Sequence, residues 1–184
     1  MENISRRKFL NRSGLLTAGI ASSALLQSFA VAQSRRVENV GLQLYTLRKE
    51  LADDFDGTLA RVAELGYKEM EFAGYFGRSA AQIKSALDAN GLVSPAAHIQ
   101  WAAVRDNLDI EIERAVGIGQ DYIVIPYLKA NERSLDHYKR LIDTLNGAGE
   151  ACREAGLKIA YHNHDYEFAT VDGVVPYDML LAQT

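Results

Sequence analysis

Beyond residue 38, one hydrophobic pattern recurs four times along the chain: an amphipathic helical stretch, a glycine and a short apolar run. The four glycines are Gly66, Gly91, Gly119 and Gly156, which stand 25, 28 and 37 residues apart. A glycine directly after a helix adopts the left-handed conformation that closes the last helical turn. An apolar run of four to seven residues that follows at once is typical of a buried parallel strand. The pattern therefore predicts a βα unit of ~30 residues that repeats along the chain.

Spelled out along the chain, this pattern predicts five strands and at least four helices. The strands are expected at about 39–45, 68–73, 92–98, 121–126 and 157–163. The helices are expected at about 55–65, 79–90, 104–118 and 134–155. A further helix is expected to begin near Pro176, because proline fits the first turn of a helix.

Five βα units fit two α/β folds, a small doubly wound sheet of the flavodoxin type or the first part of a (β/α)8 TIM barrel. A dinucleotide-binding doubly wound fold carries a glycine-rich phosphate loop after its first strand. Here residues 46–50 read Thr-Leu-Arg-Lys-Glu and contain no glycine. A complete barrel takes ~250 residues. We therefore expect a TIM barrel of which this chain holds about the first five βα units, and a complete flavodoxin-like domain remains the alternative.

The first residues of the chain follow a different pattern. Arg6 and Arg7 stand shortly before an uncharged stretch, residues 14–26, that is rich in Leu, Ala and Gly. Residues 30–32, Ala-Val-Ala, then place two small side chains around a larger one. This three-part layout is that of a secretory signal peptide, and the paired arginines are typical of the twin-arginine (Tat) type.

A membrane anchor is the alternative interpretation, because the uncharged run 13–34 has about the ~20-residue length of a bilayer span. The run also contains Ser, Thr, Gln and Gly, so no stable membrane anchor is expected. We expect a Tat signal peptide in residues 1–32 and a partial barrel domain in residues 33–184. The Tat machinery would then export the folded chain to the periplasm.

Charge narrows the classes of ligand. The chain has a formal net charge of −4 and a pI of about 5.6, and no basic run follows Arg36. Nucleic-acid binding requires a concentrated positive face, so it is not expected. A single cysteine, Cys152, cannot form an internal disulfide and is expected to be a small buried side chain. These features favour an enzyme or binding protein for small molecules.

Polar side chains stand at the ends of the predicted strands, where a barrel builds its active site. The first strand carries Gln43 and Tyr45, the second Glu71 and the third His98, and Tyr127 follows the fourth. A glutamate at such a strand end is a candidate base, or else a solvated end residue. The histidine is a candidate for the same chemistry, or else a structural residue. Aromatic side chains here, Trp101 among them, could stack on a sugar ring or simply pack the barrel mouth.

Residues 161–168, Tyr-His-Asn-His-Asp-Tyr-Glu-Phe, hold the densest chemistry in the chain. Residues two apart on a strand share a face, so His162 and His164 are expected to point the same way. Imidazole together with carboxylate suits a divalent transition metal such as Zn²⁺, Mn²⁺ or Co²⁺. A hydrogen-bonded loop without a metal remains the alternative.

Three segments resemble the sugar phosphate isomerase/epimerase family, which belongs to the xylose isomerase-like TIM barrel superfamily. They are residues 41–48 (GLQLYTLR), 67–72 (YKEMEF) and 161–168 (YHNHDYEF), and the resemblance extends from about Val37 to the end of the chain. It implies a divalent metal at the barrel mouth and a proton transfer next to a sugar carbonyl through an enediolate that the metal holds.

The resemblance also implies that one metal ligand comes from the end of the fifth strand, here His162, His164 or Glu167. Many superfamily members carry a Glu on that strand where this chain has His162, which departs from the usual ligand set. The remaining ligands usually come from strands six to eight, which this sequence lacks. We therefore expect the chain alone to be poorly stable and inactive, with an open sheet edge.

The predicted function is a metal-dependent isomerase or epimerase of a sugar or a sugar phosphate. A dehydratase or lyase for a keto-sugar or cyclitol is one alternative, and a non-catalytic periplasmic sugar-binding protein or inactive fragment is another. An endonuclease, known from the same superfamily, is disfavoured by export and by the acidic charge. The predicted catalytic residues are Glu71 and His98. The predicted substrate-binding residues are Gln43, Tyr45, Trp101 and Tyr127. The predicted metal ligands are His162, His164 and Glu167.

Overall fold

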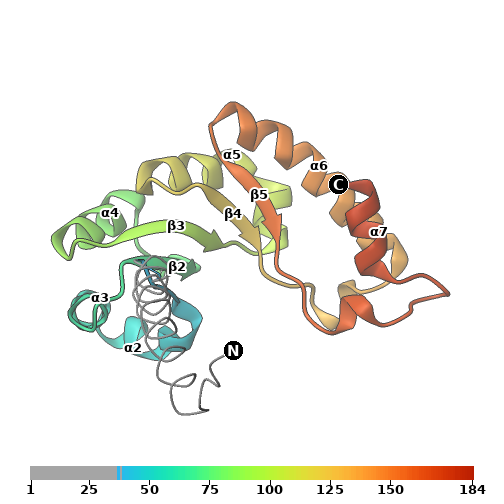
Figure 1. Ribbon diagram of the computed structural model, residues 1–184. Helices are drawn as coiled ribbons and strands as arrows, with labels where there is room; N and C mark the ends of the chain where they lie inside the picture. The colour runs from blue at the N-terminus through green and yellow to red at the C-terminus, as the bar shows by residue number, and fades with distance from the viewer. Residues whose placement is uncertain (1–36, 38) are drawn as a thin grey trace, which may run out of the picture. The chain divides into compact units, whose positions relative to one another are not determined.

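The computed structural model describes Val37 and residues 39–184, and the predicted signal peptide in residues 1–32 lies outside this part (Figure 1). Residues 39–184 form one compact unit. Within these residues, no helix combines the length and the apolar character that a membrane crossing requires.

A five-stranded parallel sheet runs through this unit (Figure 1). Its strands are β1 (Gly41–Gln43), β2 (Glu69–Ala73), β3 (Val93–His98), β4 (Tyr122–Ile125) and β5 (Lys158–Tyr161). Each strand pairs in parallel with the next one along the chain, so the order in the sheet is β1-β2-β3-β4-β5. A doubly wound sheet places its first strand inside the sheet instead. The strand order therefore confirms the partial barrel and excludes the flavodoxin-like alternative.

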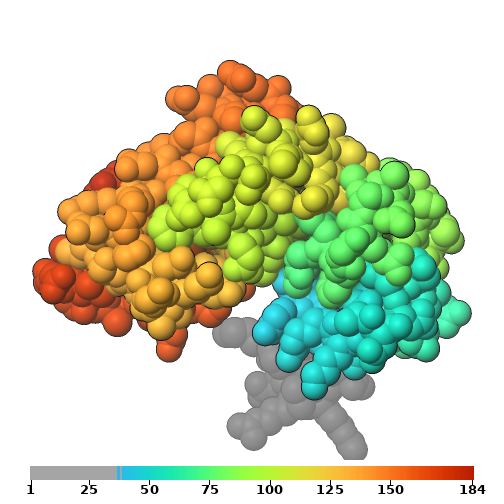
Figure 2. Space-filling view, turned by 180° about the vertical axis from the view of Figure 1, so that it is seen from behind, coloured from blue at the N-terminus to red at the C-terminus, as the bar shows by residue number. Residues whose placement is uncertain are grey.

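The helices are α2 (Arg48–Asp53), α3 (Phe55–Glu64), α4 (Ala80–Ala89), α5 (Trp101–Ile118), α6 (Leu135–Glu154) and α7 (Pro176–Gln183). The structure also has three short 3-10 helices: η1 (Leu44–Leu47), η2 (Ala130–Glu132) and η3 (Tyr166–Phe168). Helix α4 packs against α5 and α5 against α6, and Figure 2 shows this succession running from green through yellow to orange. Helices α3 to α7 confirm the predicted ones, whereas α2 and the 3-10 helices were not predicted.

The first strand is shorter than predicted because a side chain ends it. The Gln43 side chain accepts a hydrogen bond from the backbone N–H of Tyr45, which caps η1 directly after β1. The chain therefore turns into a helix at Leu44 instead of continuing as a strand to Tyr45. As a consequence, the Gln43 side chain is fixed at the carboxyl edge of the sheet.

The core lies between the sheet and its helices. Phe72 and Ile123 of the sheet are fully buried, as are Leu59 of α3, Ile83 of α4 and Leu141 of α6. The expected burial of Cys152 is confirmed, and burial raises the pKa of its thiol. β1 and β5 each have a neighbouring strand on one side only among the described strands. The expected low stability of the chain with these open edges stays a prediction.

Gly119 tests the glycine pattern on which the fold prediction rests. It ends α5 with φ of +87°, and its N–H donates to the carbonyls of Ala115 and Val116. A side chain in this left-handed conformation costs roughly 1–2 kcal/mol, so we expect Gly119→Ala to lower the free energy of unfolding by about that amount. Urea unfolding followed by circular dichroism measures the change.

The matched control is Gly147→Ala, inside α6. A Cβ atom there meets no other atom within 4 Å, and the residue has an ordinary helical backbone. Alanine is favoured over glycine inside a helix by about 1 kcal/mol, so this variant is expected to be as stable as the parent or more stable. Equal losses at both positions would contradict the proposed role of the left-handed glycine.

Candidate active site at the carboxyl ends of the strands

A cavity of about 550 Å³ lies at the carboxyl ends of the five strands. Parallel pairing brings these ends to one edge of the sheet, so residues far apart in sequence meet there. Six of the predicted site residues line it: Gln43, Tyr45, His98, Tyr127, His162 and His164. Glu71 stands directly beside them, because its carboxylate faces the His98 ring.

His98 is held between Gln43 and Glu71. The Gln43 amide oxygen accepts the Tyr45 N–H, so its NH₂ group faces His98 Nδ1 at 3.1 Å and donates to it. In the neutral ring the proton is therefore on Nε2, which lies 3.3 Å from Glu71 Oε1. His98 Nε2 is buried and makes no well-aligned hydrogen bond within the described residues. The pair is therefore close but loosely aligned, which leaves the buried Nε2 without a satisfied hydrogen bond.

The sheet register accounts for this meeting of three strands. Gln43 of β1 pairs with Glu71 of β2, and Ala73 of β2 pairs with His98 of β3. The side chain of His98 is only 12% exposed, whereas that of Glu71 is 31% exposed. The imidazole is therefore positioned by its surroundings, and the carboxylate is partly exposed.

His162 and His164 lie next to each other, although β5 ends at Tyr161 before either of them. Their ring centroids are 4.9 Å apart, and the His162 ring meets that of His98 edge-on at 5.1 Å. The backbone N–H of His162 donates to the Ile125 carbonyl of β4. Partial burial lowers the pKa of His162, and the positive charges of protonated His98 and His164 lower it further. The cavity thus gathers three imidazoles on one side.

Glu167 stands in η3 and is fully buried. One carboxylate oxygen accepts a hydrogen bond from the Tyr161 hydroxyl, and the other accepts the His164 N–H at 2.6 Å. Burial raises the pKa of Tyr161, and the hydrogen bond to Glu167 and its charge raise it further. Both oxygens of Glu167 are therefore engaged within its own loop, and the residue fixes the backbone that carries the two histidines.

The predicted metal site can be tested against these contacts. Within residues 39–184, no three His, Cys, Asp or Glu side chains converge closely enough to hold a metal ion. His162 and His164 offer two imidazoles, but the Glu167 carboxylate is engaged by Tyr161 and His164. The described residues therefore do not fit a divalent metal on their own, and the predicted ligand roles stay predictions.

Of the nine predicted site residues, Glu71, Trp101 and Glu167 do not line the cavity, and Trp101 faces a different part of the fold. It is the first residue of α5, only 3% exposed, and its indole N–H donates to the Thr144 hydroxyl of α6 at 3.1 Å. The helix begins three residues earlier than predicted, which turns this side chain toward α6. Four residues that were not predicted also line the cavity: Thr46, Ala73, Gln100 and Pro126. Each ends a strand or follows closely on a strand end.

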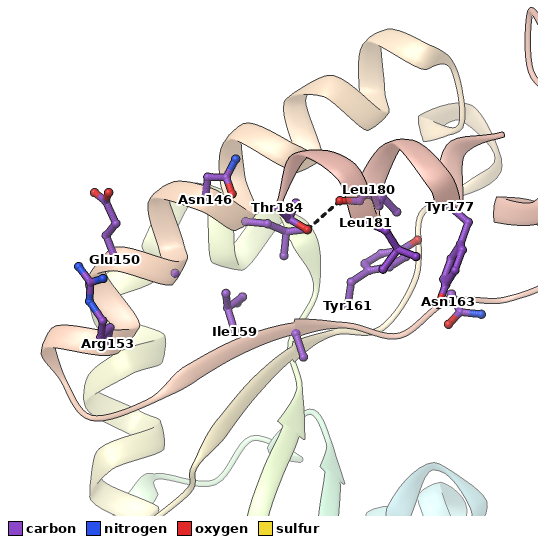
Figure 3. Close-up of a pocket in the computed structure, with 13 residues that line it drawn as sticks. Asn146, Glu150, Arg153, Ile159, Tyr161, Asn163, Tyr177, Leu180, Leu181 and Thr184 are labelled. Carbon is purple, nitrogen blue, oxygen red and sulfur yellow. Dashed lines mark hydrogen bonds between the residues drawn. The ribbon is translucent and has the colours of Figure 1, made fainter. Parts of the chain in front are cut away.

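A second cavity, of about 630 Å³, lies beside β5 under α6 and α7 (Figure 3). Figure 3 shows Ile159 and Tyr161 of the strand facing Leu180 of α7, with Asn146 on α6. It contains no histidine, and its charged side chains are Glu150 and Arg153 at its edge. The titratable groups that suit proton transfer line the smaller cavity instead, which makes that cavity the candidate active site.

The hydrogen bond from Gln43 predicts which nitrogen of His98 carries the proton. We expect Gln43→Ala to remove this preference, so that both tautomers of the ring are populated and turnover falls about tenfold, as expected for one lost hydrogen bond. Long-range ¹H–¹⁵N NMR of the histidine rings distinguishes the two tautomers. Gln100→Ala is the control, because Gln100 lines the same cavity without bonding His98. An unchanged tautomer in Gln43→Ala would contradict the assignment.

Comparison with known proteins gives one family and several similar structures. The model of the family described as xylose isomerase-like TIM barrel matches residues 59–176. No curated protein matches the chain significantly. Among solved structures, a sugar phosphate isomerase/epimerase from Parabacteroides distasonis is similar with a TM-score of 0.69 and 23% identity, over 81% of this chain and 65% of that chain.

Two further structures are more distant. A xylose isomerase domain containing protein from Salmonella typhimurium has a TM-score of 0.55 and 9% identity, over 79% of this chain and 56% of that chain. An AP endonuclease of family 2 from Brucella melitensis has a TM-score of 0.50 and 19% identity, over 58% and 48%. At these identities the likeness concerns the fold. The chain spans about two thirds of the length of the Parabacteroides protein, and less of the others.

Proposed function

Because the chain belongs to the xylose isomerase-like TIM barrel family, we propose that it isomerises or epimerises a small carbohydrate. Measurable turnover by the purified chain would overturn the inactivity expected from the sequence. The observation that carries this proposal is the His98–Glu71 pair, oriented by Gln43. His98 lines a cavity of about 550 Å³ at the strand ends, and Glu71 stands beside it. Pockets of this size suit ligands such as sugars. Tyr45 and Tyr127 at the cavity offer aromatic surface and hydroxyl groups for binding.

The pair supplies the two groups that a proton transfer next to a carbonyl requires. The Glu71 carboxylate takes the proton from the carbon beside the carbonyl, and the C–H electron pair forms the enediolate. The His98 Nε2–H donates a hydrogen bond to the oxygen on which negative charge develops. Return of the proton from Glu71 to the neighbouring carbon, together with passage of the hydroxyl proton from one oxygen of the enediolate to the other, gives the isomer. Return to the same carbon from the opposite face, by a second acid, gives the epimer.

Purified full chain with a panel of ketoses and aldoses in D₂O, followed by ¹H NMR, tests the reaction. Deuterium uptake beside the carbonyl without loss of water supports the proposal. Loss of water identifies a dehydratase instead, and saturable binding without either change identifies a sugar-binding protein. A divalent ion such as Zn²⁺, Mn²⁺ or Co²⁺ belongs to the proposal through the family resemblance alone. If deuterium exchange continues after dialysis against EDTA, the reaction needs no divalent ion and rests on Glu71 and His98 alone.

We also propose that the Tat machinery exports the chain. Cleavage after Ala32 is expected, and replacing Arg6 and Arg7 by lysine should leave most of the protein uncleaved in the cytoplasm. Cell fractionation with intact-mass analysis measures both. The matched control replaces Arg35 and Arg36, the arginine pair beyond the cleavage site. Equal export of both lysine variants would contradict the proposal.

A further inference from the structure

A third cavity, of about 460 Å³, adjoins the candidate active site. It shares Ala73, His98 and Gln100 with the cavity described above, so the two cavities adjoin at these residues. Its other walls are the loop that follows β2 and the outer part of α5. A ligand whose reacting end lies at His98 can therefore extend into it.

Two arginines from different elements line this third cavity, Arg78 from the loop after β2 and Arg114 from α5. Arg114 Nη1 donates to both oxygens of Glu111, at 3.0 and 3.1 Å, and the Glu111 side chain is only 9% exposed. The guanidinium of Arg114 also lies over the ring of Tyr75, 5.0 Å from its centroid. The carboxylate paired with Arg78, that of Asp56, is 3.8 Å away and largely exposed.

These contacts leave most of the guanidinium donors free. A guanidinium carries five N–H donors, and Glu111 engages one nitrogen of Arg114. The Arg78 guanidinium donates no hydrogen bond within the part of the chain that the structure describes, since its ion pair with Asp56 is too long for one. Planar guanidinium groups bind the oxygens of carboxylates and phosphates in pairs. The third cavity therefore presents donors that fit an anionic group.

The charge of the cavity favours a single negative charge. Its lining holds two guanidinium groups and one buried carboxylate, which leaves one positive charge in excess. A carboxylate neutralises this charge. A phosphate carries about −1.5 to −2 at neutral pH, so it would bring additional negative charge close to the buried Glu111.

We propose that the third cavity binds the carboxylate of an acidic sugar that also carries a carbonyl group, which makes a uronate the substrate class. This inference rests on the proposed function, because it places the carbonyl end of the same molecule at His98 and Glu71. Arg78 and Arg114 act as specificity-determining residues, and they do not touch the reacting atoms.

Isothermal titration calorimetry of the full chain with D-glucuronate, D-glucose and D-glucose 6-phosphate tests the inference. D-Glucuronate is expected to bind at least ~10-fold more tightly than D-glucose, as for one or two charge-assisted hydrogen bonds. Arg78→Gln should weaken D-glucuronate binding about tenfold and leave D-glucose binding unchanged. The double variant Glu111→Gln/Arg114→Gln should have the same effect on D-glucuronate binding. It removes both charges of the ion pair, so that the buried Glu111 carboxylate is not left without its partner.

Arg105→Gln is the control, because Arg105 is also on α5 but pairs with Asp106 away from the cavity. Equal binding of D-glucuronate and D-glucose, or no change in Arg78→Gln, would overturn the inference while leaving the proton-transfer chemistry intact. Arg78-dependent binding that is tighter for D-glucose 6-phosphate would overturn the carboxylate assignment. Arg78-dependent D-glucuronate binding without exchange of any sugar would support the anion site and overturn the proposed function.

Discussion

Glu71→Gln is expected to slow deuterium exchange beside the sugar carbonyl by roughly 10²–10⁴-fold, the usual contribution of a general base. Glutamine keeps the shape of the side chain, and its amide oxygen can face the His98 Nε2–H as the carboxylate oxygen does. It cannot take up a proton at neutral pH, so it removes the base and leaves the packing in place. Single-turnover exchange followed by NMR measures the rate, and sugar affinity is expected to change little.

Glu69→Gln is the matched control for this variant. Glu69 is on the same strand, two residues before Glu71 and toward the opposite end of the sheet, where it pairs with Gly41. Glu69→Gln removes the same charge as Glu71→Gln, but at a side chain that does not contact His98. Comparable losses in both variants would point to the fold rather than to catalysis. A Glu71→Gln enzyme that keeps more than a tenth of the parent rate would exclude Glu71 as the base.

The sequence was sufficient for the fold because each βα unit repeats the same local signals. Gly66, Gly91, Gly119 and Gly156 all have positive φ angles, and each stands between a helix and the strand that the pattern predicted. Strand ends follow from these positions, so six of the nine predicted site residues meet in one cavity. The order of the strands, that of a barrel or that of a doubly wound sheet, remained to be predicted. The absence of a phosphate loop after the first strand favoured the barrel, which the structure confirms.

Side-chain partners were harder to predict, because they depend on how a turn is closed. Gln43 was predicted to contact substrate, but it also caps η1 and donates to His98. Trp101 was assigned to the cavity because the start of α5 was misplaced by three residues. Residue type and spacing do not indicate that the Glu167 carboxylate accepts hydrogen bonds from Tyr161 and His164. These contacts depend on the path of the backbone through η3.

Glu167→Ala is expected to destabilise the chain by about 2–4 kcal/mol, because it leaves two donors without an acceptor, each at a cost of about 1–3 kcal/mol. These donors are the Tyr161 hydroxyl and the His164 N–H. Glu167→Gln retains one good acceptor and should cost about half as much. Urea unfolding in the presence of EDTA measures both variants. Asp165→Ala, an exposed neighbour in the same loop, is the control and should change stability by less than about 0.5 kcal/mol.

The same experiment separates the two roles considered for Glu167. A residue that only binds metal would leave the stability of the metal-free chain unchanged when replaced and would lower metal affinity. A residue that positions the histidine loop lowers stability without any metal and couples to Tyr161, so Tyr161→Phe and Glu167→Ala should be less costly together than the sum of their separate effects. Additive losses in this double-mutant cycle would contradict the positioning role. Because Glu167 fixes the His164 backbone, its loss is also expected to broaden the His164 ring signals in NMR spectra while those of His98, held from β1 and β2, remain sharp.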